Sequence, residues 1–225
     1  MKTLRGLFAL LLAACSAAAW AAAPAPVDGG LLKFAVGAEP PNYDCHAQTS
    51  FAFIHPVRPH YSTLLKFDTA NYPKIVGDLA ESWTVAKDGL TYTFKIRKGV
   101  KFHDGSTLTA EDIKATYDRI RKPPAGVLSV REEGYADIST IETPDAQTVV
   151  FRLKKPNASM LANFASPWDC VYSAAKLKQD PRWPERNVMG TGPFTFVEHV
   201  AGSHWTGKKF DGYFEKGKPH LNGYM

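Results

Sequence analysis

The stretch from residue 79 to residue 113 restricts the fold of this chain more than any other, because strand, turn and helix signals follow one another there without a gap. Residues 91–97 (TYTFKIR) alternate strictly between polar and apolar side chains. Such alternation predicts a half-buried strand, with its tyrosine, phenylalanine and isoleucine on the buried face. Tight turns are predicted on either side, at residues 87–89 and 103–105. Both contain an Asp-Gly pair, in which glycine tolerates positive φ and aspartate bonds its own backbone.

A helix is predicted shortly after the second turn. Thr109 is a favourable N-cap residue, and Asp112 stands three positions later, where it can complete a capping box. Ile113, Tyr117 and Ile120 then recur at helical spacing, which gives the helix one apolar face. The Pro-Pro pair that follows ends the helix, since a residue before proline avoids the α region.

The rest of the chain contains further short strands and helices. Alternation predicts strands at residues 31–36, 138–143, 148–153, 194–198 and 205–209, and a short strand that ends at Phe67. Apolar spacing predicts helices at residues 52–65, interrupted near two prolines, and at residues 158–165 and 174–179. Residues 68–77 are expected to form a turn-rich connection.

The first 21 residues have the pattern of a secretory signal peptide. Lys2 and Arg5 form a short basic region, and residues 7–14 form an apolar run that is too short to span a bilayer. The small residues on either side of Trp20 place the predicted cleavage after Ala21. Residues 22–30 (AAPAPVDGG) would then form a flexible leader.

A lipobox is the alternative interpretation of the same region. Residues 12–15 (LAAC) fit this motif, and Cys15 would then carry a lipid anchor. Ordinary cleavage is favoured, because the apolar core before Cys15 is short and signal-like residues continue beyond it. Both interpretations place the mature protein outside the cytoplasm.

Two cysteines, Cys45 and Cys170, remain after cleavage at Ala21. An oxidising compartment permits a disulfide, and two cysteines allow a single intramolecular pairing. Two free thiols are the alternative, because the sequence alone does not give the distance between the two Cα atoms.

Charge and motif patterns exclude several classes of function. Without Lys2 and Arg5 the chain has 25 basic and 22 acidic residues, and the basic ones are scattered, so no nucleic-acid surface is predicted. No phosphate-binding glycine loop, dinucleotide motif or nucleophile elbow is present. His55 and His60 are poorly spaced for a metal, and side chains of adjacent residues such as 44–46 rarely converge on one ion. We therefore predict no metal, no cofactor and no enzymatic activity.

Residues 79–113 also resemble the signature segment of one protein family. The pieces LAESW, DGLTYTFKIRKGVKFHDG and TAED stand here in the order typical of the family 5 solute-binding proteins of bacterial ABC importers. These proteins are the receptors for peptides, dipeptides and nickel. The resemblance continues at residues 34–41, 188–194 and 212–219, so it covers nearly all of the chain after the signal peptide. It is specific for the family and says little about the ligand.

The resemblance implies an α/β fold with mixed sheets, arranged as a periplasmic-binding-protein-like type II clamshell. Residues 31–65 and 164–225 would belong to lobe I, and residues 66–163 to a small subdomain inserted in it. Members of the family are considerably longer than this chain. The second lobe is therefore expected to be missing, and the chain is expected to be an N-terminal fragment or the product of a truncated reading frame.

The resemblance also implies a periplasmic receptor that binds an oligopeptide or dipeptide between two lobes and delivers it to an inner-membrane ABC permease. Closure of the lobes over the ligand would be the signal that the permease reads. Nickel, haem or an oligosaccharide as ligand of the same fold is one alternative. A non-transport interaction protein built from a single lobe is another.

Two loops are expected to face the cleft of such a receptor. The predicted ligand contacts are Asn42, Tyr43, His46, Ser166 and Trp168. The resemblance places Cys45 and Cys170 in the same lobe, which makes their pairing geometrically possible. A disulfide between them would make the two loops adjacent. Core packing is the alternative role for Tyr43 and Trp168.

Overall fold

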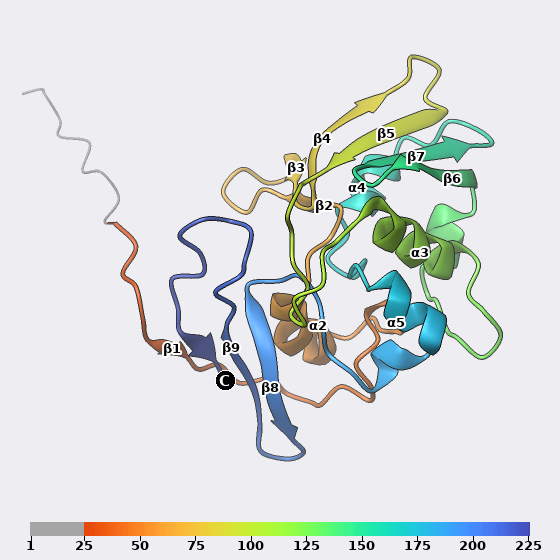
Figure 1. Ribbon diagram of the computed structural model, residues 1–225. Helices are drawn as coiled ribbons and strands as arrows, with labels where there is room; N and C mark the ends of the chain where they lie inside the picture. The colour runs from red at the N-terminus through yellow and green to blue at the C-terminus, as the bar shows by residue number, and fades with distance from the viewer. Residues whose placement is uncertain (1–24) are drawn as a thin grey trace, which may run out of the picture.

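The computed structural model describes residues 25–225 (Figure 1). The predicted signal peptide, residues 1–21, and the alternative lipidation at Cys15 lie outside the described residues, as do residues 22–24 of the predicted leader. Within residues 25–225, no helix is both long enough and apolar enough to cross a membrane.

The alternating segment at residues 91–97 lies inside the larger sheet. It forms β5 (Thr91–Ile96), and the side chains predicted for its buried face are indeed buried. Three further strands, β4 (Ala80–Val85), β7 (Thr148–Leu153) and β6 (Ile138–Asp145), complete an antiparallel four-stranded sheet in the order β4-β5-β7-β6. The two strands expected after residue 137 are thereby confirmed.

Helix α3 (Ala110–Arg121) packs against this sheet, as its predicted apolar stripe requires. Asp112 Oδ2 accepts hydrogen bonds from the backbone N of Thr109 at 2.8 Å and from its hydroxyl at 3.1 Å, so the predicted capping interaction is present. Asp112 Oδ1 accepts a third bond, at 2.8 Å, from the backbone N of Ala174. The same carboxylate therefore caps α3 and ties it to the first residue of α5 (Ala174–Gln179).

Replacing Asp112 with alanine is expected to destabilise the protein by about 1–2 kcal/mol, because the cap and the bond to Ala174 are lost together. Asp118→Ala on the same helix is the matched control, since the Asp118 carboxylate forms its ion pairs at the half-exposed surface. Urea unfolding followed by circular dichroism measures both variants. Equal unfolding midpoints would contradict the role assigned to Asp112.

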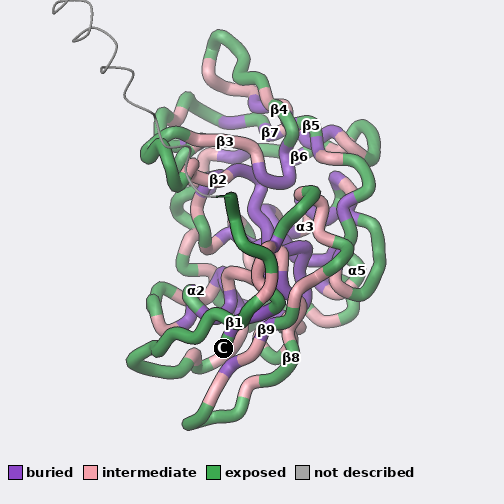
Figure 2. The backbone as a smooth tube through the Cα atoms, turned by 90° about the vertical axis from the view of Figure 1, so that its left-hand side faces the viewer, coloured by how far each residue is buried: buried purple, intermediate pink, exposed green. Residues whose placement is uncertain are grey.

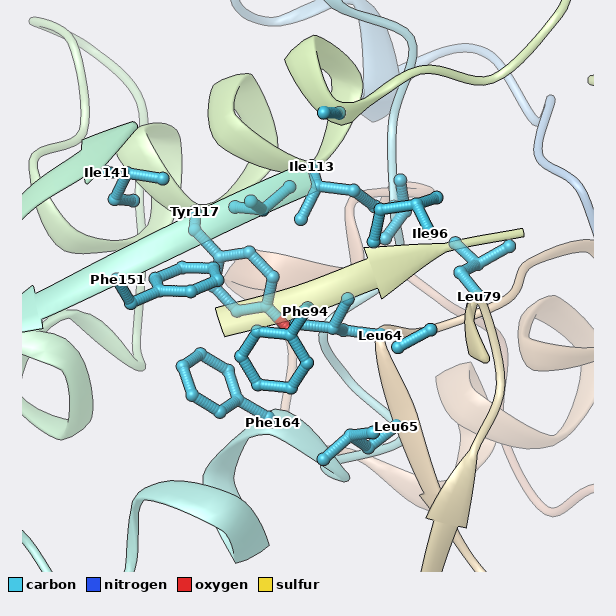
Figure 3. Packing of buried hydrophobic residues seen from close by; sticks show 14 of the residues in the cluster. Leu64, Leu65, Leu79, Phe94, Ile96, Ile113, Tyr117, Ile141, Phe151 and Phe164 are labelled. Atoms are coloured by element: carbon cyan, nitrogen blue, oxygen red, sulfur yellow. The ribbon is translucent and has the colours of Figure 1, made fainter. Parts of the chain in front are cut away.

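Aromatic side chains fill the space between α3 and the sheet (Figure 3). Phe164, at the end of α4 (Met160–Phe164), packs against Tyr117 of α3 with ring centroids 5.4 Å apart. Its ring also lies 5.1 Å from that of Phe94 and 4.7 Å from that of Phe151. Burial of these rings joins α3, α4 and the two central strands into one core.

A second four-stranded sheet lies at the other end of the molecule (Figure 1). The hairpin of β8 (Phe194–Val200) and β9 (His204–Lys209) confirms the strands predicted there. β10 (Gly223–Tyr224) pairs antiparallel with β9, and β1 (Leu31–Leu32) pairs parallel with β10. The order is β1-β10-β9-β8.

The strand predicted at residues 31–36 is shorter in the structure. Only its first two residues pair with β10, and both leucines are 49% exposed. One further ladder bond runs from the backbone N of Phe34 to the O of Met225 at 3.0 Å. Alternation alone therefore overestimated the strand, because pairing extends only as far as a neighbouring backbone does.

Short elements connect the two sheets. Besides α4, they are η1 (Cys45–Ala47), α2 (Phe51–Val57), η2 (Arg58–His60), β2 (Leu65–Phe67), β3 (Ile75–Gly77), η3 (Glu132–Tyr135), α5 (Ala174–Gln179) and η4 (Trp183–Glu185).

β3 pairs with β2 although residues 68–77 were predicted only as turns. α4 begins two residues later than predicted, because the side chain of Asn157 accepts from the backbone N of Ser159 and forms a turn there.

The observed mixture of helices with antiparallel and mixed sheets agrees with the predicted α/β class. Figure 2 shows buried backbone gathered around β5, β7 and α3, whereas β1 is exposed along its length. The borders at residues 66 and 163, between lobe I and its inserted subdomain, stay predictions.

Candidate ligand-binding site

A disulfide joins the two loops that carry the predicted ligand contacts. Cys45 begins η1 and Cys170 follows α4, and the two residues are separated by 125 positions in the sequence. Their Cα atoms lie 6.0 Å apart, and both residues are completely buried. Residues 42–48 and 166–170 therefore lie side by side.

A buried ion pair fixes the first of these loops to α3. Arg119 donates from Nη2 to Asp44 Oδ2 at 2.5 Å and from Nη1 to Asp44 Oδ1 at 3.2 Å. The hydroxyl of Tyr172 donates to Asp44 Oδ1 at 3.1 Å and accepts from the backbone N of Cys45 at 2.8 Å. Because both charged side chains are buried, this network positions Cys45 and hence the whole loop.

His46 belongs to the core under the loops and not to the ligand-facing surface, which corrects the expectation for this residue. It is completely buried. Its Nε2 donates to the backbone O of Cys170 at 3.0 Å, and its Nδ1 accepts from Arg119 Nη1 at 2.8 Å. Burial lowers the pKa of His46 to about 3, so the ring is neutral, and both nitrogens are already used inside the protein.

Asn42 and Tyr43 are half-buried and already have partners in the protein. Asn42 Oδ1 accepts from the backbone N of Asp44 at 3.0 Å and therefore shapes its own loop. The hydroxyl of Tyr43 is hydrogen-bonded to His199 Nδ1 at 3.0 Å, and its ring meets Trp205 edge-on at 5.2 Å. Tyr43 thus packs toward the β8–β9 hairpin, and a ligand contact for either residue stays a prediction.

Trp168 is half-exposed and is held between two side chains. Its ring stacks on Phe53 of α2, with centroids 6.0 Å apart and an interplanar angle of 15°. The guanidinium carbon of Arg131 lies 4.8 Å from the Trp168 ring centroid, within the range of a cation–π contact. Arg131 also donates from Nη2 to the backbone O of Gln48 at 2.9 Å. This arginine was not among the predicted contacts, since it stands in a weakly patterned stretch.

A cavity of about 270 Å³ opens beside these side chains. Its lining residues are Val130, Arg131, Gly134, Tyr135, Asn163, Ser166 and Asp169. Burial raises the pKa of Asp169 to about 7, although the Tyr135 hydroxyl and the Arg131 charge oppose the shift. Of the predicted contacts, the structure therefore brings Ser166 to this cavity and Trp168 next to Arg131.

A larger hollow, of about 710 Å³, follows residues 33–40 and the hairpin side chains His199 and Trp205. It includes none of the predicted contacts. Among residues 25–225, no buried side-chain atom that lacks a hydrogen-bond partner belongs to its lining, whereas Asp169 Oδ1 in the smaller cavity is such an atom. We therefore place the candidate site at the smaller cavity.

The part of the chain that the structure describes contains no cluster of three or more His, Cys, Asp or Glu side chains arranged to hold a metal ion. The chemistry that the candidate site does offer is recognition. A guanidinium and a carboxyl group line a small cavity, and the Trp168 ring lies against the guanidinium; all three are fixed by contacts to neighbouring residues.

Comparison with known proteins finds similar binding proteins. The chain is 35% identical over 162 residues to the glutathione-binding protein GsiB of Pectobacterium atrosepticum, which covers 72% of this chain and 31% of that protein. The fold resembles AgaA of Agrobacterium tumefaciens R10 in complex with agropinic acid, with a TM-score of 0.80, 34% identity and 87% of this chain covered. It also resembles the oligopeptide-binding protein AppA of Bacillus subtilis in complex with a nonapeptide, with a TM-score of 0.80, 28% identity and 89% of this chain covered.

The chain spans about a third of the length of GsiB and about two fifths of the two solved structures, 39% and 40%. These neighbours also support the predicted type II periplasmic-binding-protein fold. The family model for the middle part of the bacterial extracellular solute-binding proteins of family 5 matches residues 74–223, which is most of the chain. The chain therefore belongs to the bacterial extracellular solute-binding proteins, family 5.

Proposed function

We propose that this protein is the periplasmic receptor of an ABC importer and that it binds a peptide or a peptide-like solute. Family membership supports a solute-binding role, and the glutathione and nonapeptide in the names of its relatives support peptides as the ligand class. The observation that carries the proposal is the small cavity lined by Arg131 and Asp169, with the Trp168 ring packed against Arg131. No catalytic step is part of this role, because the receptor releases its ligand unchanged to an inner-membrane permease.

The geometry supports binding because the site is organised before any ligand arrives. Contacts with Phe53 and Arg131 restrict the Trp168 ring, so little rotamer freedom is lost when a ligand packs beside it. Arg131 is itself held by the backbone O of Gln48, and the disulfide keeps that loop beside residues 166–170. A peptide can pack against the exposed part of the Trp168 ring while its polar atoms reach the cavity.

The described residues form one wall of such a site. The resemblance to two-lobed receptors suggests that a second lobe closes over the ligand, so that closure depends on contacts with both lobes. In this proposal the wall described here selects the ligand, and the closed form is what the permease binds.

Trp168→Ala is expected to weaken ligand binding by about ten- to a hundredfold, because Trp168 packs against Arg131 at the cavity and fixed aromatic side chains carry much of a binding energy. The protein is expressed from its complete reading frame, its co-purified ligand is identified by mass spectrometry, and affinity is measured by isothermal titration. Trp83→Ala is the matched control, since Trp83 is also half-buried but lies on β4 and does not line the cavity. If both variants bind as the unchanged protein does, Trp168 is not part of the site.

The identity of the co-purified material tests the ligand class. A heterogeneous set of peptide masses, or one small peptide, supports the proposal. Nickel, haem or an oligosaccharide in stoichiometric amount would overturn the peptide assignment and keep the receptor fold. Fractionation of cells that express the complete reading frame should place the protein in the periplasm.

A further inference from the structure

One carboxyl oxygen in the small cavity has no partner in the protein. Asp169 is completely buried, and its Oδ2 accepts a hydrogen bond from the hydroxyl of Tyr135. Its Oδ1 is buried as well, and no donor among residues 25–225 reaches it. A buried carboxylate with an unpaired oxygen costs free energy unless a donor, and best a cation, completes it. The Asp169 carboxyl therefore favours a hydrogen-bond donor in the cavity that it lines.

Arg131 brings the opposite charge to the same cavity. Its guanidinium donates to the backbone O of Gln48 at 2.9 Å and to those of Cys45 and His46 at 3.4 Å. A guanidinium has five N–H groups, so at least two stay available to an anion. Within the described residues, Arg131 and Asp169 both line the cavity without forming an ion pair with each other. A positive and a negative group therefore face one small space separately.

Apart from Arg131, the titratable groups near Asp169 are two neutral tyrosines. Burial raises the pKa of Tyr135 in η3 and of Tyr117 in α3 well above the usual tyrosine value, and the charge of Asp169 adds to both shifts. Arg131, just before η3, is the one charged group that acts on the pKa of Asp169. Burial nevertheless outweighs it and raises that pKa to about 7, as expected for a carboxylate whose cation is not in contact. A ligand cation at Oδ1 would supply such a contact.

We propose that this cavity binds the zwitterionic head of an amino-acid-like solute, in which an ammonium group and a carboxylate stand on the same carbon. The ammonium donates to Asp169 Oδ1, and the carboxylate accepts from Arg131. A free amino acid or a γ-glutamyl peptide carries such a head, whereas an ordinary peptide has its two charges at opposite ends. The cavity volume of about 270 Å³ is sufficient for the head group alone. This inference rests on the proposed receptor function.

Isothermal titration with three probes tests the proposal on the protein expressed from its complete reading frame. The probes are γ-glutamylglycine, its N-acetyl derivative, and alanylalanine as an ordinary dipeptide. γ-Glutamylglycine is expected to bind at least about tenfold more tightly than the acetylated probe, because acetylation removes the cation. Asp169→Asn should reduce its affinity on the order of a hundredfold and leave the affinity for the acetylated probe unchanged. Asp118→Asn, which changes a half-exposed carboxylate of α3, should alter neither affinity.

A pH series gives an independent readout. The affinity of the unchanged protein for γ-glutamylglycine should fall as the pH decreases from about 8 to about 6, because Asp169 must be ionised to accept the ammonium. Asp169→Asn should remove this dependence. The inference is overturned if the free and acetylated probes bind equally, or if Asp169→Asn binds γ-glutamylglycine as the unchanged protein does. Tight binding of alanylalanine alone overturns it too but keeps the proposed function, whereas failure of every probe and of the co-purified ligand to bind overturns both.

Discussion

Replacing Arg119 with methionine is expected to lower the free energy of unfolding by about 3–5 kcal/mol, because one partner of a buried ion pair is removed. The side chains of Arg119 and Asp44 are 3% and 1% exposed, and their charged atoms lie 2.5 Å apart. Methionine fills similar space but leaves the Asp44 carboxylate buried without its cation. The Tyr172 hydroxyl and the backbone N of His46 still donate to it, and these neutral bonds do not replace the charge.

The matched control is Arg152→Met. Arg152 pairs with Glu142 on the surface, where the two side chains are 51% and 46% exposed, so its loss should cost less than about 1 kcal/mol. The double variant Asp44→Asn with Arg119→Met should recover part of the stability lost in Arg119→Met, since no charge then stays buried alone. Urea unfolding of all variants measures these differences in the free energy of unfolding. Equal midpoints for Arg119→Met and Arg152→Met would show that the buried pair does not hold the loop.

Regular alternation made the central strands predictable, and its local failure hid the edge strand β4. Residues 91–97 alternate without interruption, residues 148–153 place Val149, Phe151 and Leu153 on one face, and both segments form strands close to the expected bounds. Residues 80–85 also form a strand, but the register shifts between Ala80 and Ser82, where a bulge breaks the period of two. The alternation is left to residues 82–85 (SWTV), a run of the shortest length at which alternation indicates a strand.

The Gly-Thr-Gly segment at residues 190–192 packs closely against a distant part of the chain, which the sequence alone does not reveal. The segment lies directly before β8. Both of its glycines are required by this close packing. A Cβ atom on Gly190 would lie 2.4 Å from the backbone O of His60, and one on Gly192 would lie 2.5 Å from the backbone N of Tyr61. Contact with a segment about 130 residues away can be known only from the fold.

For the predicted ligand contacts, the sequence does not show which side chains are buried, and burial decides where each of them lies. Trp168 was predicted as a ligand contact, with core packing as the alternative, and its ring lies against Arg131. His46 was also predicted as a ligand contact, but it lies in the core, where Arg119 and Cys170 bind its two ring nitrogens. Asp169 gave no signal, since its unpaired oxygen follows from the surrounding tertiary structure.

Removal of the disulfide is expected to lower the free energy of unfolding by about 2–5 kcal/mol. The link between Cys45 and Cys170 closes a loop of more than half the chain, with 125 positions between them, and a loop of that length greatly restricts the unfolded state. Cys45→Ala combined with Cys170→Ala tests this without leaving a free thiol from the pair. Both cysteines are completely buried, so a reductant acts mainly on the unfolded chain, and urea curves must be taken at equilibrium.

Dithiothreitol supplies the internal control for this prediction. It should shift the unfolding midpoint of the unchanged protein down to nearly that of the double variant and leave the double variant itself unmoved. A shift of similar size in both proteins would mean that the reductant acts elsewhere, and no shift in either would mean that the pair is not linked in solution. Because the same link holds Ser166 and Trp168 beside the Arg131 loop, its loss should weaken ligand binding even where the chain still folds. Lower affinity together with lower stability would show that the disulfide organises the site as well as the fold.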